Sequence, residues 1–332
     1  FQAEDGIRDL VLSLVGSEMC IRDRSMLDLG SLRIPVPAVM GILNVTPDSF
    51  SDGGRFFSSD AALRQASTMA EDGAAVIDIG GESTRPGAAA VGEQEELDRV
   101  IPLIEAVASE TGTPISIDTS KPVVMREAVA AGARMINDVC ALQEDGALAA
   151  AADLQVAVCL MHMQGRPRTM QNDPLYDDVV AEVSAFLRTR LDECVAAGID
   201  ASRVVLDPGF GFGKTPAQNI ELLANLRQLQ VRNRPLLVGV SRKSTLGELT
   251  QRDVDERMPA SVAAAVMAVV NGAAIIRAHD VRETVDALKV AAAIIDAGRP
   301  AQQAGRSRPV SYTHLTLPTN VQQCSSRWAG GG

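Results

Sequence analysis

Polar and charged side chains recur in this sequence directly after short apolar runs. A single aspartate at such a place more often caps the following helix than takes part in chemistry. A whole set of amides, carboxylates and cations is hard to explain by capping alone, because these groups can together bind a ligand that carries both N–H donors and anionic oxygens. The candidate residues are Asn44, Asp118, Asn137, Asp207, Lys243, Arg277 and His279.

The basic candidates indicate an anionic ligand. The chain as a whole is acidic, with a formal net charge of −11, so a local group of cations is informative. Arginine makes bidentate contacts with phosphate, while carboxylates and amides on the opposite side suit a planar heterocycle rich in N–H groups. The pattern predicts a heterocycle pocket joined to a pyrophosphate pocket. Its cationic side is formed by Arg85, Lys243, Arg277 and His279.

Three other polar residues fit structural roles. Asp280 and Ser120 are placed as helix N-caps or loop acceptors, and Asp138 could likewise accept hydrogen bonds from the loop backbone. The carboxylates of Asp78 and Glu82 could suggest a glycosidase pair, but the aromatic residues on which sugars stack are scarce, at 3% of the chain. We therefore consider the glycosidase interpretation weak.

The segment 209–215 resembles a nucleotide-binding P-loop, but it departs from the motif. The pattern GxxxxGK[ST] requires glycine at position 208, where Pro208 stands, and Pro216 follows the segment at once. We therefore reject a P-loop.

The elements that must position the candidates alternate between short apolar runs and longer stretches with helical spacing. Apolar runs of this kind are typical of parallel strands that are covered on both faces. The predicted strands are Val39–Val45, Ala75–Ile79, Ile115–Asp118, Met135–Asn137, Val156–Met161, Val204–Asp207, Leu236–Val240 and Ala274–Arg277. The predicted helices are Ala61–Gly73, Glu93–Thr111, Lys121–Ala131, Asp145–Ala152, Val179–Ala197, Gln218–Leu229, Pro259–Asn271 and Val281–Asp296.

Eight strands that each precede a helix predict an α/β protein with a single (β/α)8 TIM barrel. The active site of such a barrel lies at the carboxyl ends of the strands, where the candidates fall, and phosphate frequently binds after strands 7 and 8. An open doubly wound sheet is the alternative. It usually has fewer strands, and its GxGxxG signature is absent here.

The two ends of the chain differ from its middle in composition. A length of 332 residues allows one large domain or two ordinary ones. We predict one catalytic barrel over residues 34–299. Residues 1–33 and 300–332 are expected to be non-native or disordered extensions and are excluded from the fold prediction.

Composition also limits the partners and the compartment. The acidic balance argues against a nucleic-acid or anionic-membrane binder, and the apolar stretch from Leu10 to Val15 is too short to span a bilayer. The five cysteines are odd in number and form no CxxC pair, which indicates reduced thiols in a cytoplasmic protein. Without an HExxH motif or a Cys/His cluster, a zinc site held by protein ligands is not expected.

The motifs of the middle region resemble those of the dihydropteroate synthase family, in the same order, over about residues 34–298. The matching strings are MGILNVTPDSFSDGG (40–54), DIGGESTRPGA (78–88), SIDTSKP (116–122), INDV (136–139), MHMQGRPRTMQNDP (161–174), DPGFGFGKT (207–215), VGVSRKS (238–244) and RAHDV (277–281).

The resemblance implies a cytoplasmic transferase of folate synthesis that is a sulfonamide target and a homodimer. It implies that 6-hydroxymethyl-7,8-dihydropterin diphosphate and 4-aminobenzoate condense to 7,8-dihydropteroate and pyrophosphate, with Mg²⁺ as cofactor. These small molecules are then the partners, with no nucleic acid and no membrane.

The resemblance also assigns roles, which we state as expectations. The catalytic residues are expected to be Asp118, Lys243, Arg277 and His279. The pterin is expected to bind to Asp118, Asn137, Asp207 and Lys243. The diphosphate is expected to bind to Asn44, Thr84, Arg277 and His279, with Asn44 also near the metal. The 4-aminobenzoate side is expected to include Phe50, Arg85, Pro86, Phe212 and Ser244.

Two alternatives stay open. One is a non-catalytic pterin- or folate-binding module of a corrinoid methyltransferase, which would need no diphosphate site. The other is an inactive paralogue of the synthase. The SRKS and RAHD segments favour the synthase.

Overall fold

The structure, a computed structural model, describes residues 26–45, 54–83, 89–165 and 174–297. The chain divides into two units, residues 1–296 and 297–332. Apart from Ala297, the last residue of a helix, the description concerns the first unit.

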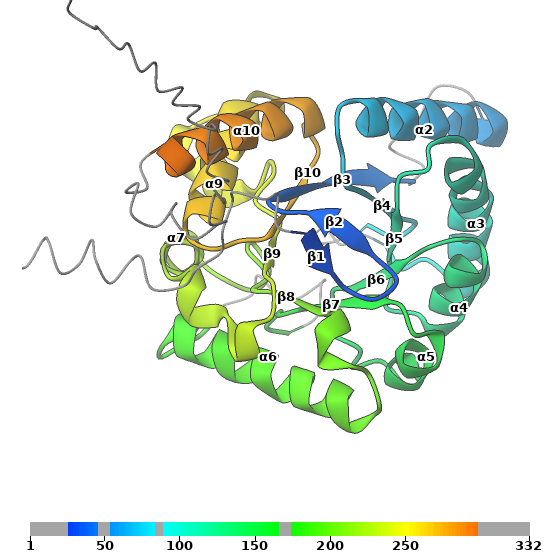
Figure 1. Ribbon diagram of the computed structural model, residues 1–332, viewed down its shortest axis with the longest axis horizontal. Helices are drawn as coiled ribbons and strands as arrows, with labels where there is room; N and C mark the ends of the chain where they lie inside the picture. Colours follow the sequence, from blue (N-terminus) through cyan, green and yellow to red (C-terminus); the bar gives the residue numbers. More distant parts are fainter. Residues whose placement is uncertain (1–25, 46–53, 84–88, 166–173, 298–332) are drawn as a thin grey trace, which may run out of the picture. The chain divides into compact units, whose positions relative to one another are not determined.

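Eight parallel strands form the centre of this unit (Figure 1), with the order β8-β7-β6-β5-β4-β3-β10-β9. The two edges of this sheet meet through a parallel bridge between Leu206 and Leu236, so the sheet closes into a barrel. The prediction of a (β/α)8 barrel is confirmed. The strands are β3 (Ala38–Asn44), β4 (Val76–Gly80), β5 (Ile115–Asp118), β6 (Met135–Asp138), β7 (Ala157–Met161), β8 (Val204–Asp207), β9 (Leu237–Val238) and β10 (Ile275–Ala278).

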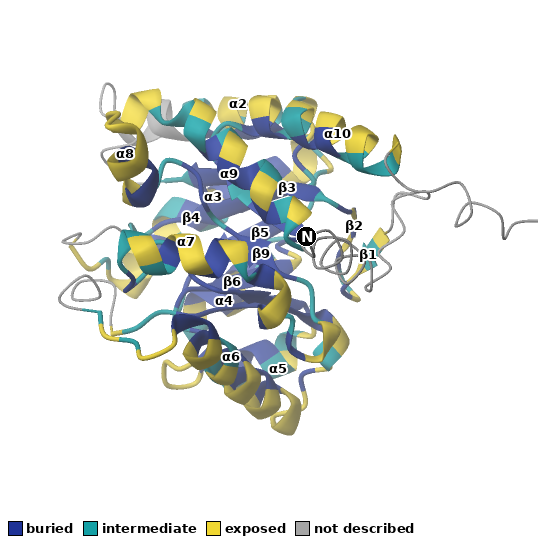
Figure 2. Ribbon diagram, turned by 90° about the vertical axis from the view of Figure 1, so that its left-hand side faces the viewer, coloured by how far each residue is buried: buried dark blue, intermediate teal, exposed yellow. Residues whose placement is uncertain are grey.

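Helices surround the barrel, and their buried faces meet the strands while their exposed faces point outward (Figure 2). Leucine, isoleucine, valine and alanine fill the layer between them; Ile104, Leu187 and Leu288 are examples. The helices are α2 (Gly54–Glu71), α3 (Glu93–Glu110), α4 (Pro122–Ala130), α5 (Ala147–Leu154), α6 (Val179–Ala196), α7 (Pro216–Ala224), α8 (Ser244–Thr250), α9 (Met258–Val270) and α10 (Val281–Ala297).

Three helices differ from the prediction. Helix α2 begins at Gly54, seven residues before the predicted start at Ala61. The stretch predicted as one helix to Leu229 is α7, which ends at Ala224, followed by a separate 3-10 turn. Helix α8 was not predicted, because its seven residues are too few to display a hydrophobic period.

A short antiparallel hairpin precedes the barrel. It consists of β1 (Met26–Asp28) and β2 (Arg33–Pro35), and its turn places Leu29 and Leu32 in full burial against the amino-terminal end of the barrel interior. The hydroxyl of Ser31 donates to the Arg134 carbonyl over 2.9 Å and accepts from the Ala157 amide over 3.0 Å. Figure 1 shows the hairpin in front of the ring of strands. The hairpin therefore closes this end of the barrel.

The folded unit consequently extends further toward the amino terminus than the predicted boundary at residue 34. That boundary falls inside the hairpin, whose Leu29 and Leu32 are core residues. The predicted leader 1–33 is thus part of the fold from Met26 onward. Residues 1–25 and 298–332 lie outside the described residues.

The barrel interior has two chemically different layers, because side chains alternate between the two faces of each strand. Near the amino ends, the inward residues are apolar: Met40, Val76, Met135, Cys159, Val205, Leu237 and Ile275 pack with the hairpin. Further along β4, β5, β6, β8 and β10, the same face carries polar side chains: Asp78, Ser116, Asp118, Asn137, Asp207 and Arg277. The hairpin thus lies at the end opposite the polar layer.

The glycine-rich segment after β8 has a fixed conformation. Gly209 has φ of +67°, and a Cβ there would lie 1.8 Å from the His162 carbonyl oxygen, so this position requires glycine. Beneath the segment, the ammonium of Lys214 donates to the carbonyls of Gly209 (3.0 Å) and Phe212 (2.9 Å). Its third contact is Nδ1 of His162, at 3.0 Å. Lys214 thus ties the segment together from inside.

We expect Leu29→Ala to destabilise the protein by about 2–5 kcal/mol, since the fully buried side chain leaves a cavity at the sealed end of the barrel. Met26→Ala in the same hairpin is the control. Met26 is 45% exposed, and its truncation should change the free energy of unfolding by less than about 0.5 kcal/mol. Urea unfolding measures both. Equal effects would show that the hairpin does not pack into the core.

We expect Gly209→Ala to cost more stability than Gly198→Ala. Both glycines have positive φ, so alanine adds backbone strain of about 1–2 kcal/mol at each. Only at Gly209 does the added Cβ also meet backbone, whereas nothing lies within 4 Å at Gly198. The collision should add about 1–3 kcal/mol. Thermal and urea unfolding of the two variants provide the comparison, and indistinguishable losses would contradict the described contact with His162.

Candidate functional site

The polar layer lies where the strands end. Parallel pairing places Asn44 beside Gly80, Gly80 beside Asp118, and Asp118 beside Asn137. A Cβ on Gly80 would lie 3.7 Å from both Asn44 Oδ1 and Asp118 Oδ2. The oxygens of Asn44 and Asp118 therefore border a common space above this glycine.

Arg277 joins three strands of the layer. From β10, its Nε donates to Asp78 Oδ2 on β4 over 2.6 Å, and its Nη2 donates to Asp118 Oδ2 on β5 over 2.7 Å. The amide Nδ2 of Asn137 on β6 donates to the same Asp78 oxygen over 3.0 Å. The guanidinium, the amide and two carboxylates form one connected network.

The network shifts the acid–base properties of its members. Burial lowers the pKa of Arg277, but the charges of Asp78 and Asp118 outweigh this effect and raise it above its usual value, so Arg277 stays cationic. Burial raises the pKa of Asp118 to about 7, although Arg277 opposes the shift. Asp118 therefore exchanges its proton near neutral pH.

Asp207 lies at the end of β8, next to the glycine-rich segment. Its Oδ1 accepts a hydrogen bond of 2.7 Å from the amide of Gly209. Burial raises the pKa of Asp207 to about 6, opposed by this hydrogen bond and by the charge of Lys243. Asp207 is thus a carboxylate at pH 7, held in one orientation by the backbone.

Lys243 faces the same segment from the loop after β9. Its ammonium nitrogen lies 3.9 Å from the centroid of the Phe212 ring, which is a cation–π contact. Burial and the neighbouring charge of Arg277 lower the pKa of Lys243 to about 8, while Asp207 opposes the shift. Lys243 is therefore mainly protonated at pH 7 but close to titration.

His279 follows β10 and is oriented by Ser241. The Ser241 hydroxyl accepts from the His279 backbone amide (3.1 Å) and lies 3.0 Å from Nδ1 of its ring. Burial and the charge of Arg277 lower the pKa of His279 to about 4. The imidazole is thus neutral at pH 7, so its contribution is hydrogen bonding rather than the cationic charge that the sequence suggested.

The residues expected to have structural roles are also placed. Asp138 accepts from the backbone amides of Cys140 (2.8 Å) and Leu142 (2.7 Å), which confirms the loop interpretation, and the Ser120 hydroxyl donates to it. Asp280 directly precedes helix α10. It pairs with Arg242, whose Nε lies 3.1 Å from Oδ2.

The structure thus brings most of the predicted site together. Asp118, Asn137, Asp207, Lys243 and Arg277 are linked by direct contacts or by mutual charge effects. Phe212 lies against Lys243, and Ser244 begins helix α8 immediately after it. Four predicted residues lie outside the described residues: Phe50, Thr84, Arg85 and Pro86.

Three residues of the site region escaped the sequence analysis. Asp78 was considered only with Glu82, although it accepts from both Arg277 and Asn137. Lys214 and His162 were seen only as parts of motifs, yet they meet under the glycine-rich segment. A charged residue inside an apolar strand is a signal that could have found Asp78, since β4 reads VIDIG.

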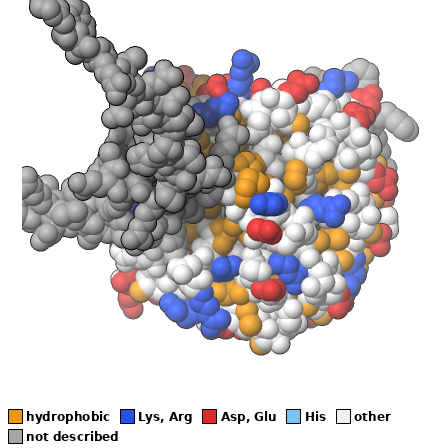
Figure 3. Space-filling view, viewed as in Figure 1, with side chains coloured by type: hydrophobic (Ala, Val, Ile, Leu, Met, Phe, Trp, Pro, Cys, Tyr) orange, Lys and Arg blue, Asp and Glu red, His pale blue; other side chains and the backbone are white. Residues whose placement is uncertain are grey.

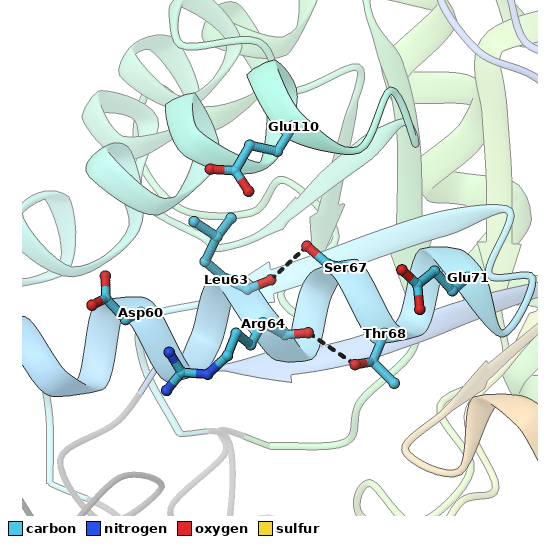
Figure 4. Close-up of a pocket in the computed structure, with 7 residues that line it drawn as sticks. All are labelled: Asp60, Leu63, Arg64, Ser67, Thr68, Glu71 and Glu110. Carbon is cyan, nitrogen blue, oxygen red and sulfur yellow. Dashed lines mark hydrogen bonds between the residues drawn. The ribbon is translucent and has the colours of Figure 1, made fainter.

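Away from the polar layer, the described residues include a hollow on the outer surface and a mixed distribution of surface charge. A hollow of about 390 Å³ between α2 and α3 lies on the outer helical shell (Figure 4), where Ser67 and Thr68 donate to carbonyls of their own helix, both over 3.0 Å. On the described part of the face in Figure 3, acidic and basic side chains are interspersed. Within the described ranges, no three His, Cys, Asp or Glu residues gather as metal ligands. None of the helices described there is long and apolar enough to cross a membrane.

Comparisons with known proteins identify the family of this chain. A family model described as pterin binding enzyme matches residues 40–279. The dihydropteroate synthase of Escherichia coli K12 is 54% identical over 267 residues, which cover 80% of this chain and 95% of that protein.

Solved structures give the same result. A Yersinia pestis dihydropteroate synthase in complex with a sulfonamide drug has 52% identity and a TM-score of 0.78, covering 82% of this chain and 100% of that chain. A Xanthomonas albilineans dihydropteroate synthase in complex with 7,8-dihydropteroate has 50% identity and a TM-score of 0.75, covering 83% and 100%. The chain therefore belongs to the pterin-binding enzyme family and, within it, to the dihydropteroate synthases.

Proposed function

We propose that this protein condenses 6-hydroxymethyl-7,8-dihydropterin diphosphate with 4-aminobenzoate, giving 7,8-dihydropteroate and pyrophosphate. The observation that carries the proposal is the polar layer itself. Carboxylates and an amide on β5, β6 and β8 face cations from β10 and the loop after β9, which suits a ligand with an N–H-rich ring and an anionic tail. Membership of the dihydropteroate synthases supports the same reaction.

The pterin side of the site consists of Asp118, Asn137, Asp207 and Lys243. Carboxylates of Asp118 and Asp207 would accept ring N–H groups, and Lys243 would donate to a ring carbonyl or nitrogen. The charges of Lys243 and Asp207 influence each other's pKa, and both side chains border the glycine-rich segment, Asp207 through the Gly209 amide and Lys243 through the Phe212 ring. A flat ring between them would meet both an acceptor and a donor.

The diphosphate side consists of Arg277, His279 and Asn44, with Thr84 expected there from the sequence. The guanidinium has five N–H groups, and the contacts with Asp78 and Asp118 engage two of them. Among the described residues, none accepts from the remaining side-chain N–H groups, which would donate to phosphate oxygens. His279 would add a neutral hydrogen bond.

The residues present fit a role for Mg²⁺. Magnesium is usually held by one or two protein oxygens together with substrate phosphates rather than by a full protein cage. Asn44 supplies one amide oxygen, bordering the space above Gly80 that Asp118 also borders. Bound there, Mg²⁺ would neutralise charge on the departing pyrophosphate.

The 4-aminobenzoate side is proposed to involve Phe212 and Ser244 together with Phe50, Arg85 and Pro86. The backbone of Phe212 is held from below, since its carbonyl accepts from Lys214, and its ring lies against the ammonium of Lys243. Ser244 lies at the exposed start of α8, where its hydroxyl would meet the benzoate carboxylate. The aromatic face of Phe212 would then lie between the pterin and benzoate halves.

In the reaction, the bond between the pterin methylene carbon and the diphosphate oxygen breaks, and the electron pair leaves with pyrophosphate. Arg277 and His279 stabilise the negative charge on the leaving group, while Asp118 stabilises positive charge that develops on the ring. The aniline nitrogen forms the new C–N bond and releases a proton. This attack requires positioning more than a strong base, so no side-chain nucleophile is needed.

The two alternatives explain the site less well. A pterin- or folate-binding module of a corrinoid methyltransferase would need no anion-binding group, yet Arg277 is held by two carboxylates with part of its guanidinium left for a ligand. An inactive paralogue would not be expected to retain both the pterin side and the diphosphate side.

A homodimer and a cytoplasmic location complete the proposal. Large apolar side chains on the outer faces of α9 and α10 are exposed and would be covered by a second copy: Met267, Val270, Val290 and Ile294. The buried cysteines Cys159 and Cys194 are free thiols, which fits a reducing compartment.

Pyrophosphate release on mixing both substrates with the protein and Mg²⁺ tests the function. We expect Lys243→Ala and Asp207→Ala to lose most of the turnover, at least about a hundredfold, while far-UV circular dichroism stays unchanged. Excess chelator should also abolish product formation. Near-normal dihydropteroate formation by either variant would refute the assigned site, and binding of the pterin without any release of pyrophosphate would favour the binding module.

We expect kcat/KM for the pterin diphosphate to be bell-shaped with pH, with its maximum between about 7 and 8. Below that range, protonation of Asp118, whose pKa burial raises to about 7, removes an acceptor. Above it, Lys243, whose pKa burial lowers to about 8, loses its charge. Lys243→Arg should remove the alkaline limb, because arginine stays protonated.

The acid limb should not reflect unfolding. The pKa of Asp118 is higher in the folded state than its ordinary value of 3.8, so between these values the folded state binds more protons than the unfolded state. Lowering the pH through this window therefore favours folding at this group while it reduces activity.

The alkaline limb has its own test. An alkaline limb that is unchanged in Lys243→Arg would contradict the assignment of that limb to Lys243.

A further inference from the structure

Asp78 is a fully buried carboxylate inside the barrel. It lies in β4, two residues before the strand ends at Gly80, on the face that points to the interior. Below it on the same face is the apolar Val76, and above it is the space bordered by Asn44 and Asp118. Asp78 is therefore the floor of the polar layer.

One oxygen of Asp78 serves both halves of the proposed site. Oδ2 accepts from Nε of Arg277 over 2.6 Å and from Nδ2 of Asn137 over 3.0 Å. Arg277 belongs to the proposed diphosphate side, and Asn137 to the proposed pterin side. Among the described residues, Asp78 is the one carboxylate that bonds to both.

The second oxygen of Asp78 is buried and has no hydrogen-bond partner among the described residues. An unpaired buried carboxylate oxygen is unfavourable for folding. An ion pair in such a place is also a weak source of stability, because desolvation opposes the attraction. The contacts of Asp78 are thus better explained by what they do for Arg277 and Asn137 than by stability.

These contacts determine which polar atoms of Asn137 and Arg277 point toward a ligand. Because Asn137 donates through Nδ2 to Asp78, its amide cannot flip, and its Oδ1 is left to accept an N–H group. Because Asp78 and Asp118 hold Nε and Nη2 of Arg277, the Nη1 edge of the guanidinium is left for an anion.

We propose that Asp78 is a positioning residue that couples the pterin and diphosphate halves of the site, a role that rests on the proposed function. It fixes the amide orientation of Asn137 and the guanidinium orientation of Arg277 through a single oxygen. Binding of the pterin and binding of the diphosphate should then both depend on this one buried side chain, although it acts only through Asn137 and Arg277.

The test uses two ligands that each probe one half. Isothermal titration calorimetry measures binding of 6-hydroxymethyl-7,8-dihydropterin, which lacks phosphate, and of inorganic pyrophosphate with Mg²⁺. In Asp78→Asn, which keeps the size but not the charge, both affinities should fall about tenfold or more. Steady-state kinetics should show a lower kcat, with KM for 4-aminobenzoate within about twofold of wild type, since Phe212 and Ser244, the described residues of that side, form no hydrogen bond with Asp78.

Asp138→Asn is the matched control. Asp138 is equally buried and follows Asn137 directly, but it points to the other face of β6 and bonds to Ser120 and the loop backbone. This variant should lose stability while both affinities stay at the wild-type level.

A double substitution separates positioning from folding. Asn137→Asp alone places two carboxylates together. Adding Asp78→Asn restores the hydrogen bond, with residue 78 now the donor and residue 137 the acceptor. The total charge of the pair is the same as in the wild type. Pterin affinity should rise relative to Asn137→Asp alone. Pyrophosphate affinity should stay low, because Arg277 then faces an amide. This pattern would hold even if Asp78→Asn alone folds poorly.

Three other results would contradict the proposal. If Asp78→Asn weakens binding of only one of the two ligands, or of neither, Asp78 does not couple the two halves. If the exchange of donor and acceptor fails to raise pterin affinity, Asp78 does not act through the amide of Asn137. If the wild-type protein itself binds neither ligand, the proposed function fails and the coupling fails with it.

Discussion

The guanidinium of Arg277, held between the carboxylates of Asp78 and Asp118, is the interaction on which the rest of the site depends. Two buried carboxylates so close together would repel each other without a cation, and a buried cation would be costly without them. The contacts require β4, β5 and β10 to end at matching heights, which the parallel register of a closed barrel provides. The fold therefore serves as a frame for a charge arrangement that no single element could hold.

The surroundings of this network make it rigid and dry. On one side, the apolar layer around Met40 and Met135, sealed by the hairpin residues Leu29 and Leu32, keeps the dielectric low. On the other side, Lys214 holds the glycine-rich segment through two carbonyls, which fixes the amide that orients Asp207. Sites built on strand ends gain precision when such supporting contacts lock them.

The barrel and most of its polar layer could be predicted from the sequence, because apolar runs end in residues such as Asp118 and Asp207 with a regular spacing. Asp78 could not be assigned its role, since its partner Arg277 is 199 residues away and only closure of the barrel brings them together. The hairpin was missed for a different reason. Its buried Leu29 and Leu32 belong to a stretch whose composition suggested a non-native or disordered extension. Their burial depends on the amino ends of β6 and β7, which the hairpin contacts through Ser31.

The charges of the site match the charge separation of the proposed reaction, in which the ring becomes positive and the leaving pyrophosphate carries negative charge. Acceptors lie on β5, β6 and β8, and the cations Lys243 and Arg277 come from the loop after β9 and from β10. When the carbon–oxygen bond breaks, the ring becomes more positive and pyrophosphate carries away negative charge. Groups that are already oriented need no reorganisation as this dipole grows, so they stabilise the transition state more than the ground state. His279, which is neutral at pH 7, can assist the leaving group by a hydrogen bond without adding a third cation beside Arg277 and Lys243.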